Sequence, residues 1–369
     1  MLIKSLKLKD FRNYNDLYLE FENALNIIYG NNAQGKTNII EAIFLCAAGR
    51  SHRTSRDAEL IRNTASCYYI DLLIEKDKDE QEIEVRYSQE ERKKIRINEI
   101  PIKRLGDLMG HLNAVMFSPE DLLIIKQGPA ERRRFIDITL SQLRPSYFFD
   151  LQKYAKILYQ RNSLLKEVSI KKSLVPTLEI WDEHLIQTSV KIMKARYDFV
   201  RRLSEKASER HKKLTNGEES LKITYEPSFA CNMEEDKLKE NFYRLIEKNR
   251  EKEIYKGTTI LGPHRDDINI ELNSESTKIY GSQGQQRTSV LSMKLAEIDI
   301  IKEETDDFPV LLLDDVLSEL DDRRQEFLLE SIDGMQTFIT CTEKRFYRKN
   351  DDKAAFFYVE GGKINKITK

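Results

Sequence analysis

The alternation of apolar and polar residues predicts β-strands at the start of the chain. Leu17, Leu19 and Phe21 alternate with polar neighbours, and the apolar run 25–29 stops at a glycine. Alternation with a period of two and short apolar runs are both typical of strands. A helix over residues 38–47 is predicted by apolar residues at helical spacing, namely Ile39, Ile40, Ile43 and Phe44. The chain therefore opens with strands that lead into a helix.

More strands follow, and then the pattern changes to long helices. Alternating residues predict antiparallel strands over 67–75, 82–87 and 94–98. From about residue 118, apolar residues recur every three or four positions, which predicts two long helices. Their seams are Phe148, Leu151, Ala155, Leu158, Asn162 and Leu165 in the first, and Trp181, Leu185, Thr188, Ile192, Ala195 and Phe199 in the second. We expect an antiparallel hairpin whose arms of about 35 residues span roughly 50 Å.

The last third of the chain mixes strands and helices again. We expect a helix over 236–251, β-structure over 257–273 and a helix over 289–301. The apolar run 309–313, a helix over 322–332 and a strand over 337–340 then follow in strand–helix–strand order. That order is typical of an α/β core, in which the apolar strands lie inside a parallel sheet.

A phosphate-binding motif lies between the strand at 25–29 and the helix at 38–47. The residues that fill G-x-x-x-x-G-K-[ST] are Gly30, Asn31, Asn32, Ala33, Gln34, Gly35, Lys36 and Thr37. Such a loop turns its backbone N–H groups toward one point, and the helix N-terminus adds positive potential there. We expect Lys36 to reach the β- and γ-phosphates and the Thr37 hydroxyl to bind Mg²⁺. Asn38, the next residue, is a further candidate for phosphate contact.

Two carboxylates, Asp314 and Asp315, end the apolar strand that begins near Pro309. The C-terminal end of a buried parallel strand lies beside a phosphate loop of this kind, so a carboxylate there can hold the Mg²⁺ shell. We assign Asp314 that role, and we assign Asp315 to orienting or deprotonating the attacking water. Lys36, Asp314 and Asp315 are thus the candidate catalytic residues.

Composition narrows the class of protein further. Of 369 residues, 40% are hydrophobic and 33% are charged, which fits a packed core under a heavily solvated surface. The four cysteines form no CxxC pair, so neither a zinc site nor a redox dithiol is indicated. No apolar run approaches the ~20 residues of a membrane span, and we expect a cytoplasmic protein without a membrane partner. Residues 117–215 hold 20 lysines and arginines against 12 aspartates and glutamates, so a polyanion could dock there.

A second glycine-containing stretch precedes the predicted helix at 289–301. Its residues Ser282, Gln283, Gly284 and Gln285 resemble the ABC signature S-G-G-Q, with Gln283 in place of the first glycine. Together with the phosphate loop and the two aspartates, this stretch resembles the SMC-like ABC-type ATPases, and most closely their branch in bacterial recombinational repair. The remaining residues that carry the resemblance are 11–14, 118–121, 129, 132–137, 262–267 and 314–321. It covers essentially the whole chain.

The resemblance implies an α/β fold, an ABC-type P-loop ATPase head with a mixed sheet, an antiparallel β region and an inserted α-helical lid. The head would comprise residues 1–117 and 256–369, and the lid residues 118–255. The cofactors implied are ATP and Mg²⁺, and the implied partners are DNA with gaps or single-strand/double-strand junctions and the mediators RecR and RecO. Such proteins form an ATP-dependent homodimer that clamps DNA and promotes RecA loading.

Carried over residue by residue, the resemblance implies that Ser282, Gly284 and Gln285 contact the nucleotide held by the other subunit. Gln127 matches the glutamine that meets the metal or the water, and Arg12 is a candidate phosphate contact. ABC enzymes usually have glutamate at the position of Asp315, and many have a histidine near 340–342 where this chain has none. Both departures predict slow hydrolysis of ATP.

Three other functions are weighed against this one. A DNA-binding scaffold could use the nucleotide only as a structural ligand, and the effect of Asp315→Asn would separate it from a timed clamp. The basic helical hairpin argues against the ATPase subunit of a membrane transporter, and the lack of a CxxC hook argues against a double-strand-break repair head. Arg132–Arg134 could contact DNA or order the lid, or they could form a solvated helix face. His264 and Arg265 are assigned a structural or interface role, with DNA contact as the alternative.

Overall fold

The computed structural model describes residues 1–22, 24–343 and 354–367, and the chain divides into two compact units. The first unit is Met1–Leu122 with Lys294–Lys369, and the second unit is Leu123–Met293. This division groups residues 256–293 with the helical segment, whereas the sequence places a boundary after residue 255. The reason is strand pairing, because β10 (Asp267–Leu272) pairs along its whole length with β9 (Leu221–Glu226).

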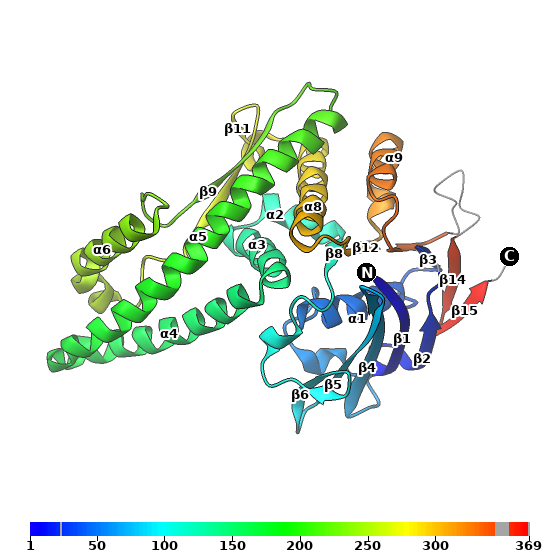
Figure 1. Cartoon of the computed structure of the whole chain (residues 1–369), viewed down its shortest axis with the longest axis horizontal. Coiled ribbons are helices and arrows are strands. Elements are labelled where there is room, and N and C mark those ends of the chain that lie inside the picture. Colours follow the sequence, from blue (N-terminus) through cyan, green and yellow to red (C-terminus); the bar gives the residue numbers. More distant parts are fainter. Residues whose placement is uncertain (23, 344–353, 368–369) are drawn as a thin grey trace. The chain divides into compact units, whose positions relative to one another are not determined.

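An antiparallel sheet forms one part of the first unit (Figure 1). Its strands, in spatial order, are β2 (Tyr14–Glu20), β1 (Leu2–Phe11), β4 (Cys67–Lys76), β5 (Asp79–Ser88), β6 (Arg92–Ile97) and β7 (Ile100–Pro101). Alternate residues of β4 are buried, as the period-two pattern predicts. The strands predicted over 67–75, 82–87 and 94–98 are confirmed.

A mixed sheet forms the other part of the first unit. Its order is β15 (Lys363–Ile367), β14 (Ala355–Glu360), β3 (Leu25–Tyr29), β13 (Thr337–Cys341), β12 (Val310–Asp314) and β8 (Ala114–Phe117). All neighbours are parallel except β14 and β15, so the predicted parallel core is confirmed. The carboxyl ends of β3, β12 and β13 therefore meet at one edge of the sheet.

Helix α1 (Lys36–Ala48) contacts strands of both sheets, which explains its burial. Every residue from Ile39 to Ala48 is buried, so the helix has no solvated face over this length. The other helical elements of this unit are η1 (Asp57–Leu60), η2 (Leu105–Leu108), η3 (Pro119–Leu122), η5 (Val316–Glu319), α9 (Asp322–Ser331) and the second half of α8 (Gln283–Thr305). Helices predicted at 38–47, 289–301 and 322–332 are confirmed, and α8 begins earlier than predicted.

The second unit is mainly helical. Besides β9 and β10 it contains α2 (Leu123–Lys126), α3 (Pro129–Leu143), α4 (Pro145–Ile170), η4 (Lys172–Leu174), α5 (Val175–Leu214), α6 (Glu235–Lys256), β11 (Glu275–Ser276) and α7 (Thr277–Tyr280). Figure 1 shows α4 and α5 as the predicted antiparallel hairpin, joined by the short η4. Its arms are unequal, with 26 residues in α4 and 40 in α5.

The buried stripe of α4 differs from the predicted seam. Leu165 is buried as predicted, but Ala155 is exposed. The buried residues are instead Tyr147, Tyr154, Ile157, Arg161, Leu165 and Val168. The apolar pattern failed because polar groups with internal partners occupy part of this stripe, as the fully buried Arg161 does. On α5 the seam holds at Leu185, Thr188, Ile192 and Phe199.

His264 lies in the loop before β10 and is held by two contacts inside the second unit. Tyr154 Oη lies 2.5 Å from its Nδ1, and its Nε2 lies 3.2 Å from the carbonyl oxygen of Thr259. Burial lowers the pKa of His264 to about 4. The structural role predicted for this residue therefore has a specific physical basis.

Acid is expected to destabilise the second unit through His264. The unfolded chain takes up the proton at about pH 6.5, while the folded state resists it until about pH 4. The stabilisation is therefore complete above pH 6.5 and is lost as the pH falls toward 4, by up to about 3 kcal/mol. Urea unfolding of wild type and His264→Gln at several pH values measures the difference. The same slope in both proteins would contradict this, and His184→Gln, at an exposed histidine of α5, is the control.

Across the described residues, none of the helices combines the length and the apolar character that a bilayer crossing requires.

Candidate phosphate-binding site

The loop between β3 and α1 has the backbone geometry of a phosphate cradle. Gly30 and Gly35 have φ angles of +150° and +114°, which favour glycine. A Cβ on Gly30 would lie 2.3 Å from the carbonyl oxygen of Val359 in β14, so there is no room for a side chain. The loop is therefore closely supported by the C-terminal strand, a contact that the motif alone does not reveal.

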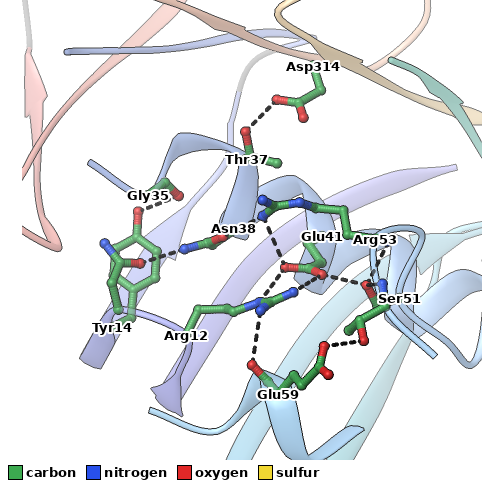
Figure 2. A network of polar contacts seen from close by, with 12 residues as sticks. Arg12, Tyr14, Gly35, Thr37, Asn38, Glu41, Ser51, Arg53, Glu59 and Asp314 are labelled. Atoms are coloured by element: carbon green, nitrogen blue, oxygen red, sulfur yellow. Dashed lines mark hydrogen bonds and ion pairs between the residues drawn. The ribbon is translucent and has the colours of Figure 1, made fainter. Parts of the chain in front are cut away.

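Lys36, Thr37 and Asp314 lie together at this loop. Lys36 is almost fully buried, and its Nζ donates to the carbonyl oxygens of Gly30 and Asn31 at 2.8 and 2.9 Å. Thr37 Oγ1 donates to Asp314 Oδ1 at 2.9 Å, although 277 residues separate them in the chain (Figure 2). The structure thus brings together the three residues assigned to phosphate and metal.

The hydroxyl of Thr37 and the carboxylate of Asp314 fit Mg²⁺, which prefers oxygen ligands and binds few protein groups directly. Burial raises the pKa of the Asp314 carboxyl, and hydrogen bonds from Thr340 and Thr37 oppose this increase. A cation would stabilise the ionised form of this buried carboxylate. In the part of the chain that the structure describes, no cluster of three or more His, Cys, Asp or Glu side chains could hold a metal.

Asp315 starts η5 in a left-handed backbone conformation, with φ of +52°. Its N–H donates to Thr340 Oγ1 at 2.9 Å, and it lines a hollow of about 210 Å³ together with Asn32 of the phosphate loop. The other lining residues are Leu317, Ser318, Gln325, Thr340, Cys341, Thr342 and Glu343. Positive φ in a residue other than glycine costs on the order of 1–3 kcal/mol and is common at functional sites. Asp315 therefore lines the same hollow as Asn32 of the phosphate loop.

Thr340 connects the two aspartates, because it donates to Asp314 Oδ1 at 2.7 Å and accepts the Asp315 N–H. In the sequence, this position is marked only by its place at the end of the predicted strand 337–340 and by the lack of a histidine there. The pairing of β13 with β12 is the signal that finds it, since Thr340 is the register partner of Asp314.

Thr340→Val is expected to weaken metal-dependent phosphate binding about tenfold. The change keeps the shape but removes one hydrogen bond from a buried carboxylate and leaves the Asp315 N–H without its acceptor. Titration with Mg²⁺ at fixed ATP would measure the effect. Thr340→Ser, which keeps the hydroxyl, is the control; equal Mg²⁺ dependence in the valine variant and wild type would contradict the role.

Arg12 and Arg53 place positive charge beside α1. Both face the buried carboxylate of Glu41, to which Arg12 donates from Nε and Nη2 at 2.8 and 2.7 Å (Figure 2). Arg53 Nη1 lies 3.8 Å from Glu41 and donates to Asn38 Oδ1 at 3.2 Å. Burial alone would raise the pKa of Glu41, but hydrogen bonds from Arg12 and Ser51 hold it below its usual value. Arg12 and Asn38 are candidates from the sequence, whereas no motif marks Arg53 or Glu41.

The other sequence-predicted site residues belong to the second unit. Ser282 Oγ accepts the backbone N–H of Gln285 at 3.2 Å, and Gln285 Oε1 accepts the N–H of Ser282 at 2.9 Å. This reciprocal pair caps the start of α8, where Gly284 lies. The carbonyl oxygen of Gln127 accepts hydrogen bonds from Arg132 and Lys278. Four predicted site residues therefore lie in the second unit, namely Gln127, Ser282, Gly284 and Gln285. The predicted phosphate-loop residues lie in the first unit.

Comparison with known proteins shows which protein family this chain resembles. The model of the RecF/RecN/SMC N terminal domain matches residues 2–365. The DNA replication and repair protein RecF of Acetivibrio thermocellus is 53% identical over 366 residues, covering 98% of this chain and 99% of that protein. RecF of Clostridium kluyveri is 45% identical over 368 residues, covering both chains completely.

Solved structures give the same result. A structure described as the recombination mediator protein RecF with ATP in the RecFOR pathway superimposes with a TM-score of 0.93, at 38% identity over 99% of this chain and 97% of that one. The Smc head domain of Pyrococcus furiosus shares the fold, with a TM-score of 0.56 at 20% identity over 99% of this chain and 96% of that one.

The mixed sheet, the phosphate loop and the Thr37–Asp314 pair define an ABC-type ATPase head of the SMC-like class. Within that class, the chain belongs to the RecF family of DNA replication and repair proteins.

Proposed function

We propose that this protein binds Mg-ATP at the phosphate loop and, as an ATP-dependent homodimer, clamps DNA at single-strand gaps or junctions in the cytoplasm. With RecR and RecO it promotes RecA loading during recombinational repair, and slow, DNA-dependent hydrolysis of ATP resets it. The observation that carries the proposal is the 2.9 Å hydrogen bond between Thr37 and Asp314 next to a buried Lys36, because this arrangement suits a phosphate chain with its cation.

The residues have distinct proposed roles in this reaction. Bound Mg²⁺ would neutralise charge on the phosphates, and Thr37 and Asp314 would hold it, with Gln127 as a further candidate ligand. Lys36 directs its ammonium group at the β- and γ-phosphates, and Asp315 orients the attacking water. The backbone of residues 30–35 binds phosphate, and Asn38 and Arg12 add polar groups beside it.

The dimer is proposed to complete the site. Ser282, Gly284 and Gln285 would face the nucleotide of the partner subunit, so that both nucleotides are enclosed only when the two copies associate. The start of α8 supports this role, since a capped helix N-terminus carries positive potential toward an anion. DNA affinity is expected to come mainly from phosphate contacts and to fall as salt rises.

Size measurement by sedimentation tests the proposal. Wild type is expected to change from monomer to dimer when Mg-ATP is added, and a gapped duplex should favour the dimer. Ser282→Arg should bind Mg-ATP normally and remain monomeric, because the added side chain fills the interface. A wild type that keeps one size with and without Mg-ATP and gapped DNA would overturn the proposed dimer clamp.

Asp315→Asn decides between a timed clamp and a scaffold. The clamp predicts a variant that dimerises on DNA but dissociates slowly, because the water is no longer activated. A scaffold predicts unchanged dissociation. The residence time on gapped DNA after dilution into ATP-free buffer is the measurement.

A further inference from the structure

Three consecutive side chains at the turn between β1 and β2 contact the phosphate loop and α1, and Figure 2 shows two of them, Arg12 and Tyr14. Arg12 binds Glu41 of α1, as described above. Asn13 Nδ2 donates to the carbonyl oxygen of Gln34 at 2.7 Å. Tyr14 Oη donates to the carbonyl oxygen of Gly35 at 3.0 Å. The loop is therefore held from outside at two successive peptide groups.

Asn13 is the centre of this contact. Besides its bond to the loop, its Oδ1 accepts a hydrogen bond from Asn38 Nδ2 at 2.8 Å. A Cβ on Gly35 would lie 2.4 Å from Asn13 Nδ2, so the amide fills the space that a side chain at residue 35 would need. One amide group thus joins the end of the loop to the first turn of α1.

The turn of the β14–β15 hairpin contacts the side chain of Gln34 and the backbone of Asn13. Gly361 donates its N–H to Gln34 Oε1 at 2.6 Å. A Cβ on Gly362 would lie 2.8 Å from the backbone oxygen of Asn13, which shows how closely the two turns approach. The backbone of Asn13 thus lies against the C-terminal hairpin, while its exposed side chain contacts the phosphate loop.

The backbone around Asn13 is strained. Asp10 and Arg12 have φ angles of +51° and +54°, which residues other than glycine rarely adopt. Backbone hydrogen bonds fix both, from Arg12 N to Leu60 O at 2.7 Å and from Arg62 N to Asp10 O at 2.9 Å. Strained residues persist only where their surroundings determine them strongly, and they concentrate at functional sites.

We propose that Asn13 is a positioning residue that holds the phosphate loop in its binding conformation before the nucleotide arrives. This inference rests on the proposed function, because the ligand it prepares for is the phosphate chain of ATP. Asn13 acts through the backbone of Gln34 and through Asn38. The position requires an amide, since one side must donate to a carbonyl and the other must accept.

The test compares Asn13→Ala and Asn13→Asp with wild type, and uses Asn15→Ala as a matched control at an exposed asparagine of β2. Asn13 is itself exposed, so the variants should fold. Without nucleotide, backbone amides of residues 31–38 should exchange hydrogen about tenfold faster in both Asn13 variants. Affinity for Mg-ATP should fall about tenfold, as expected for one to two lost hydrogen bonds, and saturating Mg-ATP should restore protection.

The two readouts separate the possible failures. Unchanged exchange in the nucleotide-free variants overturns the positioning role, and if affinity still falls, Asn13 contacts the nucleotide directly. If the Asn13 variants exchange faster but the wild type does not bind Mg-ATP, the positioning role of Asn13 is supported and the proposed function is contradicted. An aspartate variant that behaves as wild type in exchange and affinity would show that the donor to Gln34 is dispensable, which also overturns the proposal.

Discussion

Replacing Lys36 by alanine is expected to lower the affinity for Mg-ATP at least about a hundredfold. The side chain is buried at the loop, and its Nζ is held by the carbonyl oxygens of Gly30 and Asn31. When a phosphate chain binds, the ammonium group exchanges these neutral acceptors for negatively charged phosphate oxygens, and it gains a charge–charge attraction that is strong at a buried position. Isothermal titration of wild type and variant with Mg-ATP measures the loss.

Lys36→Ala should also abolish ATP-dependent dimerisation while the fold is retained. Residues 39–48 of α1 are buried and the helix contacts strands of both sheets, so the thermal midpoint should change by no more than a few degrees. Lys4→Ala, at a half-exposed lysine paired with Glu75, is the control and should bind Mg-ATP like wild type. Affinity within threefold of wild type in Lys36→Ala would show that the nucleotide binds elsewhere.

Motifs predict the candidate phosphate-binding site because its chemistry depends on short, contiguous stretches. The strand before Gly30, the helix after Thr37 and the apolar strand ending at Asp314 were all confirmed at their expected places. Parallel pairing of β3, β13 and β12 then brings Asp314 to Thr37, which the order of elements already favoured.

The supporting groups could not be predicted in the same way. Asn13 reaches the loop only because β1 and β2 turn beside it, and Glu41 is buried because α1 contacts both sheets. From the sequence alone, an acidic residue between apolar neighbours on a helix is expected to face solvent, because its partners in the fold are not known. Arg12 and Ser51 are distant from Glu41 in the chain, and tertiary structure alone reveals them.

The partners of the buried polar residues in the helical unit could not be predicted from the sequence either. Arg132 was open to DNA contact or to ordering the lid, and the structure pairs it with Asp267 through Nε and Nη2 at 2.6 and 2.7 Å. Arg133 donates to the carbonyl oxygen of Asp266 at 2.7 Å. Both side chains therefore order the start of β10 and the residue that precedes it. The basic run by itself could not distinguish this role from a surface for DNA.

Arg161→Leu is expected to destabilise the helical unit by about 3–5 kcal/mol. The fully buried guanidinium donates to Asp182 Oδ1 at 2.7 Å, to Glu253 Oε2 at 2.6 Å and to Thr259 Oγ1 at 2.7 Å. It thus joins α4, α5 and α6 at one point. Removing it leaves the buried carboxylate of Glu253 without a charged partner, and an uncompensated buried charge is the largest cost in such a pair.

The loss should appear as a lower urea midpoint and as faster hydrogen exchange in α4, α5 and α6, with little change in the strands of the first unit. Arg201→Leu is the matched control, because Arg201 is exposed on α5 and pairs with Glu205 in an i,i+4 arrangement worth about 0.5 kcal/mol or less. A cost below about 1 kcal/mol for Arg161→Leu would contradict the role of this cluster.

Neutralising the acids together with Arg161 should recover much of the loss. In a triple variant that adds Asp182→Asn and Glu253→Gln to Arg161→Leu, no carboxylate remains buried without its partner. Asp182 also accepts a hydrogen bond from Arg250 at 3.1 Å, and Glu253 accepts the N–H of Ile260 at 2.8 Å, so amides at both positions keep some of their donors. Because burying a charge costs more than burying an amide, the triple variant should be more stable than Arg161→Leu alone. If it is less stable, the hydrogen bonds of the cluster, and not the balance of its charges, hold the three helices together.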